Sequence, residues 1–166
     1  MISNNIIELR KYGAKIGENV YIGEDVYFEV ENLGFLEISD GAVISAHCKF
    51  VFHDSSLNNV TGDPIRYGKI RIGKNSYIGF DTLLLPGTLI ADNVIIGAGS
   101  LVSGNYPSEN VYIGRPAKQY CTIKELQEKW QNTGDRFHKI KTEKWFKRSI
   151  EQSLDLEQQK KKILNT

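Results

Sequence analysis

The chain has 166 residues, enough for one domain with a sizeable core, and its 21 Lys and Arg residues nearly balance its 20 Asp and Glu residues, giving a formal net charge of +1. This balance gives no support for nucleic acid as a partner. No apolar stretch is long enough to span a membrane, and the first residues lack a basic start followed by an apolar run, so neither a transmembrane segment nor a signal peptide is expected.

A short lead-in of residues 1–12 precedes a regular pattern in which a large apolar residue recurs at every sixth position. The pattern starts at Ile16, Ile22 and Phe28. A small side loop is expected between Phe28 and Glu37. Beyond this loop the same spacing returns at Ile38, Ile44 and Phe50. Such internal periodicity is typical of repeat architectures.

The longest interruption of the pattern runs from His53 to Lys69. It contains Gly62, Pro64 and Gly68 among polar residues and few apolar ones, so it is expected to form a loop. Long loops on a rigid scaffold often carry binding and catalytic residues. This loop is therefore the first place to look for a functional site.

The most regular part of the chain follows that loop. Large aliphatic residues stand six positions apart at Ile72, Ile78, Leu84, Ile90, Ile96 and Val102. The next residue is small in five of the six cases, and the residue four places on is small or β-branched in five. A period of six fits neither an amphipathic helix nor a hairpin ladder, but it fits a short strand followed by a tight corner. Three such units would close one 18-residue turn, and stacked turns would form parallel ladders about 4.8 Å apart. The alternative is an ordinary β-sandwich in which the spacing arises by chance.

The character of the chain changes after Lys118. Thr122 and Glu125 form a capping box, which predicts that a helix begins there. Leu126 and Trp130 would give this helix an apolar side.

The rest of the tail is expected to hold a second helix from Thr142 to Leu164, beyond a break at Gly134. We interpret the tail as a cap over the open end of the repeat structure or over a neighbouring subunit. The chain is therefore divided into a repeat domain, residues 1–120, with a loop protruding at about 53–69, and a C-terminal helical extension, residues 121–166.

Three stretches resemble the hexapeptide-repeat acyltransferases: IGENVYIGEDV, IGKNSYIGFDTLLLPGTLIADNVIIGAGSLV and the closing VYIGRPAK. The resemblance covers roughly residues 13–120 and points to the sugar and polysaccharide O-acetyltransferase branch, similar to the maltose, galactoside and capsule acetyltransferases. It implies a mainly β fold, a left-handed parallel β-helix (hexapeptide-repeat solenoid) with a C-terminal α-helical tail, in which residues 1–120 are the acyltransferase domain. It also implies acetyl-CoA as acyl donor without a metal, a glycan or small-molecule acceptor, and a homotrimer with active sites between subunits.

His53 stands where the regular repeat gives way to the long loop. A repeat interior has no use for an imidazole, so the side chain is expected to point outward, and an imidazole titrates near neutral pH, which suits a general base. Local features alone leave a loop histidine without a role as an equal alternative. The resemblance implies the catalytic role, because members that acetylate sugars carry their catalytic histidine just before such a loop, and His-Asp-Ser, as in residues 53–55, is common among those that acetylate surface polysaccharides.

Asp54 and Glu29 are candidate substrate-binding residues. Asp54 could orient His53, contact the acceptor sugar or cap a turn. Glu29 lies where related enzymes carry a polar residue that touches the acceptor or steadies the histidine. The alternative for Glu29 is a solvated charge in a side loop.

Five residues are candidates for binding the coenzyme, which in this family lies in a groove between neighbouring subunits. By resemblance, Gly79 and Ala98 would offer backbone groups to the pantetheine arm, and Ser103 would contact the coenzyme. Arg115 and Lys118 would reach the 3′-phosphate, whereas the position after Ser103, often Lys in the family, is Gly in this chain. The alternatives are that Gly79 is only a corner glycine and Lys118 only a surface charge.

Other functions stay open. The same base could acetylate the amine of an amino sugar, and a non-catalytic repeat protein would only assemble with partners. The γ-class carbonic anhydrases bind metal through three histidines on this fold, but His47 and His53 are six residues apart, unlike the pair in that class, and His138 lies in the tail. His47 is therefore interpreted as a surface or interface histidine. Cys48 and Cys121 are far apart in the sequence and form no C-x-x-C motif, so they are interpreted as reduced thiols of a cytoplasmic protein.

Overall fold

The computed structural model describes residues 5–132 and 150–164. The chain forms two compact units, Met1–Leu126 and Gln127–Thr166. The first unit carries the repeat and the predicted site residues.

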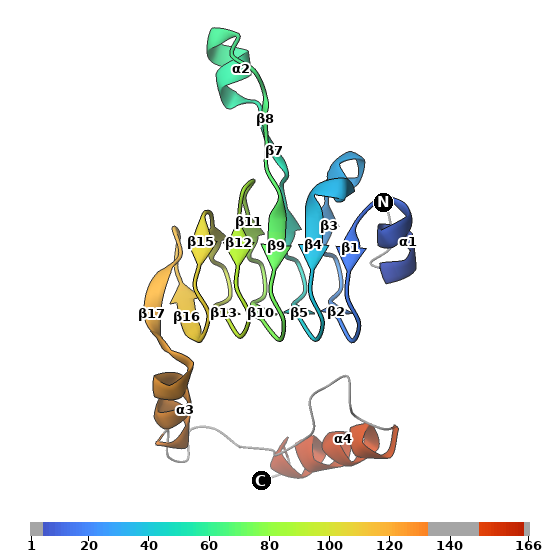
Figure 1. Cartoon of the computed structure of the whole chain (residues 1–166). Coiled ribbons are helices and arrows are strands. Elements are labelled where there is room, and N and C mark those ends of the chain that lie inside the picture. The colour runs from blue at the N-terminus through green and yellow to red at the C-terminus, as the bar shows by residue number, and fades with distance from the viewer. Residues whose placement is uncertain (1–4, 133–149, 165–166) are drawn as a thin grey trace. The chain divides into compact units, whose positions relative to one another are not determined.

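The first unit is a coil of short strands arranged in three sheets (Figure 1). Successive strands of a turn join different sheets, so each regular turn adds one strand to every sheet. Sheet A contains, in spatial order, β1 (Lys15–Ile16), β4 (Leu36–Ile38), β9 (Ile70–Ile72), β12 (Leu89–Ile90) and β15 (Asn105–Tyr106). Sheet B contains β2 (Tyr21–Ile22), β5 (Val43–Ile44), β10 (Tyr77–Ile78), β13 (Ile95–Ile96), β16 (Asn110–Ile113) and β17 (Lys118–Thr122). Sheet C contains β3 (Tyr27–Phe28), β6 (Lys49–Phe50), β11 (Leu83–Leu84) and β14 (Leu101–Val102).

The pairing register follows the six-residue pattern. In the regular part of the coil, paired residues in neighbouring turns lie 18 positions apart, as in Tyr77 with Ile95 and Leu83 with Leu101. These ladders are parallel, because the chain runs in the same direction at each pass. The 18-residue turn predicted from the sequence is therefore confirmed, and a sandwich is not formed.

The aliphatic residues of the pattern fill the interior of the coil. From Ile72 to Val102, each of the six is at most 4% exposed. The residues four places on are buried as well, at Ser76, Thr82, Thr88, Val94 and Ser100. Each buried hydroxyl donates to a backbone carbonyl, as Thr82 does to Gly79 O at 2.7 Å. The wall of the coil thus buries its apolar side chains while keeping these hydroxyls hydrogen-bonded.

Elements that the six-residue pattern did not predict cover strands near the two ends of the coil. At the start, helix α1 (Ile6–Lys11) buries Leu9 fully, and the Arg10 guanidinium donates to Ile16 O at 2.7 Å. At the far end, β17 pairs antiparallel with β16. Uncovered strands offer unpaired backbone groups, so such covers are needed. Residues 1–12, expected as a plain lead-in, therefore contain a covering helix.

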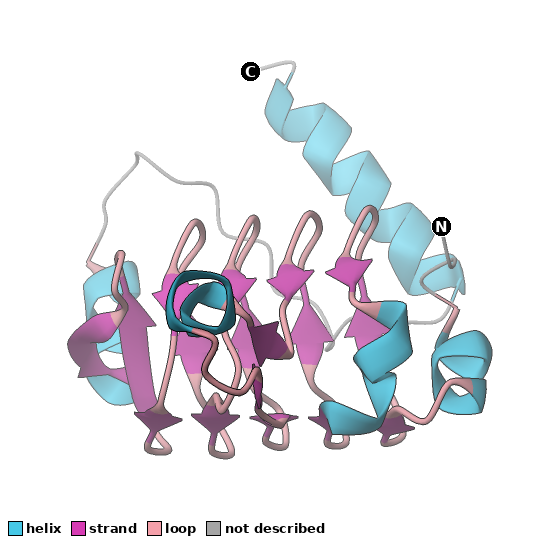
Figure 2. Cartoon of the chain, turned by 90° about the horizontal axis from the view of Figure 1, so that it is seen from above, coloured by secondary structure: helices cyan, strands magenta, loops and turns pink. Residues whose placement is uncertain are grey.

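Two excursions leave the coil at equivalent corners, after a strand of sheet C and before a strand of sheet A. The first, between β3 and β4, holds the 3-10 helix η1 (Val30–Phe35), where a side loop was expected. The second, between β6 and β9, is residues 53–69, called the arm below. The arm consists of β7 (His53–Asp54), α2 (Ser56–Thr61) and β8 (Arg66–Tyr67). It projects from the coil in Figure 1, and Figure 2 looks down onto α2 at its end.

The tail begins with helix α3 (Ile123–Gln131), whose predicted capping box is confirmed. Thr122 Oγ1 accepts the backbone N–H of Glu125 at 3.2 Å, and Glu125 Oε2 accepts the N–H of Thr122 at 2.7 Å. Helix α4 (Ile150–Leu164) forms the end of the second predicted helix. Gly134 and residues 142–149 lie outside the described residues. No helix within the described ranges is long and apolar enough to cross a membrane.

Candidate active site

His53 and Glu29 meet at the corners where the two excursions begin. Glu29 directly precedes η1 and His53 opens the arm. Strands β3 and β6 are neighbours in sheet C, and the rings of Phe28 and Phe50 stack with centroids 4.9 Å apart, which brings the two corners together. Glu29 Oε2 lies 2.9 Å from Nδ1 of His53, and the side chains are 13% and 37% exposed, respectively. A largely buried carboxylate therefore stands behind an accessible imidazole.

The hydrogen bonds of Glu29 determine which nitrogen of His53 carries the proton. Oε2 also accepts the backbone N–H of Phe52 at 2.9 Å and Nδ2 of Asn32 at 3.3 Å. Because this oxygen accepts from both neighbours, we assign His53 Nδ1 as a donor to it, which leaves a lone pair on Nε2. Within residues 5–132 and 150–164, Nε2 has no hydrogen-bond partner. The imidazole is therefore arranged to accept a proton at Nε2.

Asp54 lies on the other face of the arm, because neighbouring residues of a strand point to opposite sides. Its Oδ1 accepts the hydroxyl of Ser56 at 2.6 Å and the backbone N–H of Ser56 at 3.0 Å, and its Oδ2 accepts Arg66 Nη2 at 2.9 Å. The bonds from Ser56, followed by that from Arg66, hold the pKa of Asp54 well below its usual range. In the described part of the chain no hydrogen bond joins Asp54 to His53. The turn-capping role is thus observed, and contact with the acceptor stays a prediction.

A cleft of about 320 Å³ lies beside Asp54, between the arm and the neighbouring corners of the coil. Its other lining residues are Arg66, Tyr67, Gly68, Leu85, Pro86, Gly87 and Ser103. The cleft brings together two predicted site residues, Asp54 and Ser103, that are far apart in the sequence. His53 is not part of its lining. Tyr67 connects the two features, because it lines the cleft and its ring also lies beside the imidazole.

Gly79 is required by the packing of the coil itself. A Cβ at this position would lie 2.4 Å from the backbone nitrogen of Ala98 in the next turn, closer than real Cβ atoms come. The N–H of Gly79 donates to Ile96 O at 2.8 Å, and its carbonyl accepts the Thr82 hydroxyl at 2.7 Å. The role of corner glycine is thus observed. Ala98 is exposed at the equivalent corner one turn further on, and coenzyme contacts by either residue stay predictions.

Ser103, Arg115 and Lys118 lie toward the C-terminal end of the coil. The phenol oxygen of Tyr106 accepts the backbone N–H of Ser103 at 3.0 Å and donates to its carbonyl at 3.1 Å, so the hydroxyl is the main free group of Ser103. Arg115 Nη1 donates to Gly99 O at 3.3 Å, and Lys118 is exposed at the start of β17. Their contacts with the coenzyme stay predictions.

The side chains of Cys48 and His47 both contact other parts of the coil. The Cys48 thiol is buried and donates to Gly79 O at 3.2 Å, and burial raises its pKa to about 11, so it is a poor nucleophile. His47 turns an exposed corner with a φ of 60° and meets the Phe80 ring edge-on, with centroids 4.9 Å apart. Among the described residues, which do not include His138, no three of His, Cys, Asp and Glu gather to hold a metal ion.

Two residues beside the His53–Glu29 pair were not predicted from the sequence. Tyr67 pairs with His53 in the β7–β8 hairpin, and their ring centroids are 5.8 Å apart. The one feature of the sequence that could have drawn attention to Tyr67 is that it is an aromatic residue near the end of a polar stretch. Asn32, which donates to Glu29, carried no signal, because its contact depends on the shape of η1.

Comparison with known proteins gives this geometry a context. Residues 69–104 match the family model described as bacterial transferase hexapeptide (six repeats). The galactoside O-acetyltransferase of Escherichia coli strain K12 is 28% identical over 123 residues, which cover 68% of this chain and 57% of that enzyme. The chain spans less than two thirds of the length of the first curated relatives it matches.

Solved structures share the fold. A galactoside acetyltransferase in complex with coenzyme A has a TM-score of 0.56 at 22% identity, over 86% of this chain and 81% of that one. A hexapeptide-repeat acetyltransferase of Vibrio cholerae complexed with acetyl-CoA has a TM-score of 0.55 at 18% identity, over 67% of this chain and 61% of that one. The resemblance to hexapeptide-repeat acyltransferases drawn from the sequence is therefore confirmed.

Proposed function

We propose that this hexapeptide-repeat protein is an acetyl-CoA-dependent O-acetyltransferase whose acceptor is a sugar or a surface-polysaccharide precursor. The observation that carries the proposal is the His53–Glu29 pair, in which Nδ1 is held at 2.9 Å by the carboxylate and Nε2 is left without a partner among the described residues. The galactoside O-acetyltransferase among the relatives supports the acceptor class. The left-handed sense of the coil, a cytoplasmic location and the division at residue 120 between acyltransferase domain and helical extension belong to the same proposal.

In the proposed reaction, His53 acts as the general base. The acceptor hydroxyl donates a hydrogen bond to Nε2, and its oxygen attacks the thioester carbonyl while the proton passes to Nε2. The tetrahedral oxyanion then collapses, the carbon–sulfur bond breaks, and the departing thiolate takes the proton from the imidazolium. The products are the acetyl ester of the acceptor and free coenzyme A.

Glu29 is proposed as the residue that positions His53. By accepting from Nδ1, the carboxylate fixes the tautomer and the plane of the ring, and it stabilises the imidazolium that forms during transfer. Its anchors, the N–H of Phe52 and the amide of Asn32, hold the carboxylate in turn. Contact of Glu29 with the acceptor, on the exposed edge of the carboxylate, is a second part of this proposal.

The acetyl group is proposed to pass directly from the thioester to the acceptor. An intermediate on Cys48 is disfavoured, because that thiol is buried and its pKa is raised to about 11. The donor is proposed to lie along the corners that carry Gly79, Ala98 and Ser103, with Arg115 and Lys118 near its 3′-phosphate. The cleft that Asp54 and Ser103 share supports the part of this placement that concerns Ser103, since the other four candidates are not among its lining residues.

A homotrimer is part of the proposal, since the family's donor groove lies between two subunits. Sheet B supports it, because the outward side chains of four successive strands are the apolar or aromatic Tyr21, Val43, Tyr77 and Ile95. Tyr21 and Tyr77 are 39% and 44% exposed. The outward face of sheet A instead carries charged residues, including Lys15, Glu37 and Arg71. An apolar ladder open to solvent is typical of a surface that another subunit covers.

The proposal is tested by acetyl transfer with the purified full chain. Acetyl-CoA is incubated with maltose, methyl β-galactoside, glucosamine and an oligosaccharide panel, while free thiol and the mass of the product are followed. Ester formation on a hydroxyl supports the proposal, and an amide on glucosamine alone would reassign the chain to N-acetylation. No thiol release with any acceptor, together with no thermal shift by acetyl-CoA, would favour a non-catalytic protein. Light scattering should give the mass of a trimer, and a fully active monomer would contradict the shared groove.

A further inference from the structure

The hairpin at the base of the arm places an aromatic ring beside the proposed base. His53 and Tyr67 are direct partners in the antiparallel β7–β8 pair, as are Asp54 and Arg66. Directly opposite residues of such a pair point to the same face. Tyr67 therefore shares the face of His53, and their rings are tilted by 33° with centroids 5.8 Å apart.

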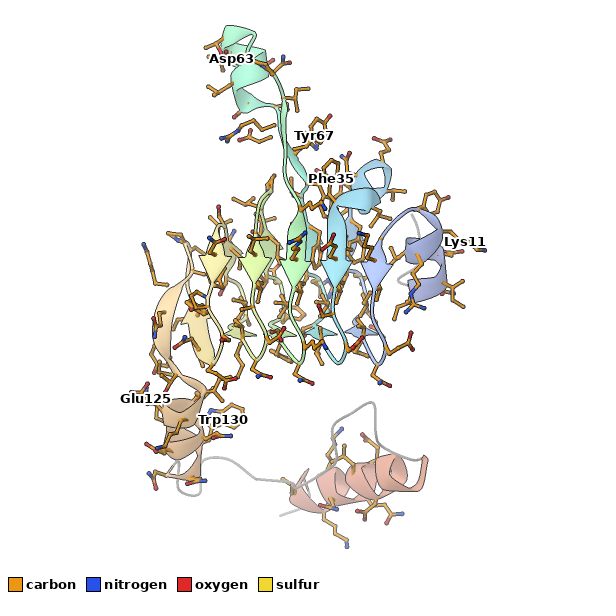
Figure 3. All side chains as sticks on the ribbon, in the orientation of Figure 1. Lys11, Phe35, Asp63, Tyr67, Glu125 and Trp130 are labelled. Atoms are coloured by element: carbon orange, nitrogen blue, oxygen red, sulfur yellow. The ribbon has the colours of Figure 1, made fainter. Side chains whose placement is uncertain are left out.

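A second aromatic ring extends this surface. Phe35, at the end of η1, stacks on Tyr67 with ring centroids 5.8 Å apart and an interplanar angle of 20°. Figure 3 labels Phe35 and Tyr67 where the first excursion and the base of the arm approach each other. The rings of Phe35, Tyr67 and His53 thus form a continuous row that joins the two excursions, which we call the aromatic row.

Tyr67 is not explained by packing alone. It remains 53% exposed in spite of its two ring contacts, and its phenol oxygen has no hydrogen-bond partner among the described residues. The buried tyrosines of the coil behave differently, since Tyr106 bonds to Ser103 and Tyr112 donates to Pro107 O at 3.1 Å. An exposed ring with an unbonded hydroxyl offers both an apolar face and a polar edge to a ligand.

The chemistry at His53 limits where an acceptor can lie. Nδ1 is occupied by Glu29, so a reacting hydroxyl must approach Nε2 to within hydrogen-bond distance. The rest of the acceptor then extends over the surface next to the imidazole. Tyr67 contributes a half-exposed aromatic ring to that surface, and a pyranose matches it because one side of the sugar ring carries C–H groups and its rim carries hydroxyls.

We propose that Tyr67, supported by Phe35, is the platform on which the acceptor sugar ring stacks, and that it selects cyclic over acyclic polyols. This assignment rests on the proposed sugar O-acetyltransferase function. None of the five coenzyme candidates belongs to the aromatic row, although Tyr67 also lines the cleft that holds Ser103. Loss of the Tyr67 ring should therefore weaken acceptor binding much more than it weakens binding of acetyl-CoA.

The test compares four variants of the full chain. Tyr67→Phe keeps the ring, Tyr67→Leu keeps much of the bulk without a flat face, and Tyr67→Ala removes both. Tyr12→Ala is the matched control, because Tyr12 is 55% exposed, lies just after α1 and makes no ring contact with the aromatic row. Thermal melting establishes that each variant is folded.

Steady-state kinetics are measured with the methyl glycopyranoside that the wild type acetylates best and with sorbitol as an acyclic polyol. The Leu and Ala variants should raise the Michaelis constant for the pyranoside about 10- to 100-fold, much more than they change the Michaelis constant for acetyl-CoA or the rate with sorbitol. The Phe variant and the Tyr12 control should stay within about threefold of wild type. A pyranoside Michaelis constant that stays the same in the Leu and Ala variants overturns the platform.

A binding measurement separates this inference from the proposed function. Saturation-transfer NMR with methyl β-galactoside should show contact with the wild type and its loss in Tyr67→Leu, whether or not turnover occurs. Failure of the wild type to acetylate any acceptor would contradict the proposed function, yet the binding contrast would still support the platform. Equal saturation transfer in wild type and Tyr67→Leu, or no binding to wild type, contradicts the platform.

Discussion

The wall of the coil and the base of the arm use similar polar groups in opposite ways. In the wall, the N–H and carbonyl of Gly79 and the hydroxyl of Thr82 all bond to other groups of the wall. At the base of the arm, His53 has one nitrogen bound and the other without a described partner, and the Tyr67 hydroxyl likewise has none. In the repeat, polar groups are thus used for hydrogen bonds within the coil. In the excursions, the Nε2 atom of His53 and the hydroxyl of Tyr67 are left available to a ligand.

Substitution of His53 is the strongest test of this difference between the arm and the coil. His53→Ala should lower turnover by about 10² to 10⁴-fold, the usual size for loss of a general base. The melting temperature should change little, because the imidazole is 37% exposed and fills no core. Turnover and melting are measured on the same preparation. A rate equal to wild type would show that His53 is not the general base. A large loss of stability would show that its side chain helps to hold the coil together.

Glu29 tests whether the carboxylate acts through His53. Glu29→Gln keeps the shape of the side chain and can still accept from Phe52, but it loses the charge that stabilises the imidazolium. We expect kcat to fall about 10- to 100-fold with little change in the Michaelis constant for acetyl-CoA. In the double variant with His53→Ala, the Gln substitution should cost almost nothing further. Additive losses would instead indicate that Glu29 acts independently of His53.

Gly79 tests the wall side of the comparison. Gly79→Ala would place a Cβ 2.4 Å from the Ala98 nitrogen, so the next turn must shift, and unfolding free energy should fall by about 1–3 kcal/mol. Gly34→Ala is the control, because a Cβ there meets nothing within 4 Å, and its effect should stay within about 0.5 kcal/mol. Chemical denaturation measures both. Equal stability of the two variants would show that the corner tolerates a side chain.

Asp54 gives the smallest expected effect. Its folded pKa is lowered by Ser56 and Arg66, so its contribution to stability is present above the unfolded pKa of about 4 and is lost as the pH falls below that value. Asp54→Asn should therefore melt slightly below wild type at pH 7, and the gap should narrow as the pH falls from about 4 toward the lowered folded pKa. Because the carboxylate is exposed, the gap is expected to be small. A gap that widens on acidification would contradict the assigned partners.

The repeat could be predicted because its constraints are local and periodic. An interior filled by Ile72, Ile78 and Leu84 requires large residues at fixed intervals, and the corners require small ones, so spacing alone gave the 18-residue register. His53 could be singled out because it ends that spacing. The covering helix α1 and strand β17 follow no such period and were missed.

The surroundings of His53 could not be predicted in the same way. Glu29 is 24 residues away in the sequence, and its contact with His53 depends on how η1 folds. The position of Tyr67 depends on the register of β7 with β8, and one residue of slippage would have placed Arg66 opposite His53 instead. The side chains of Asp54 and His53 point to opposite faces of the arm, because neighbouring residues of a strand alternate in direction.

The corner that the two excursions share allows the chain to absorb extra length without losing register. Partners Lys15 and Glu37 are 22 positions apart across the first excursion, and Glu37 and Arg71 are 34 apart across the arm, instead of 18, yet both pairs continue the ladder of sheet A. Extra length at this corner therefore adds only the slowly growing entropic cost of loop closure. Exchange of residues 54–67 between relatives should therefore change the acceptor preference without altering the coil. The arm is the segment that directed evolution of new acceptors would vary.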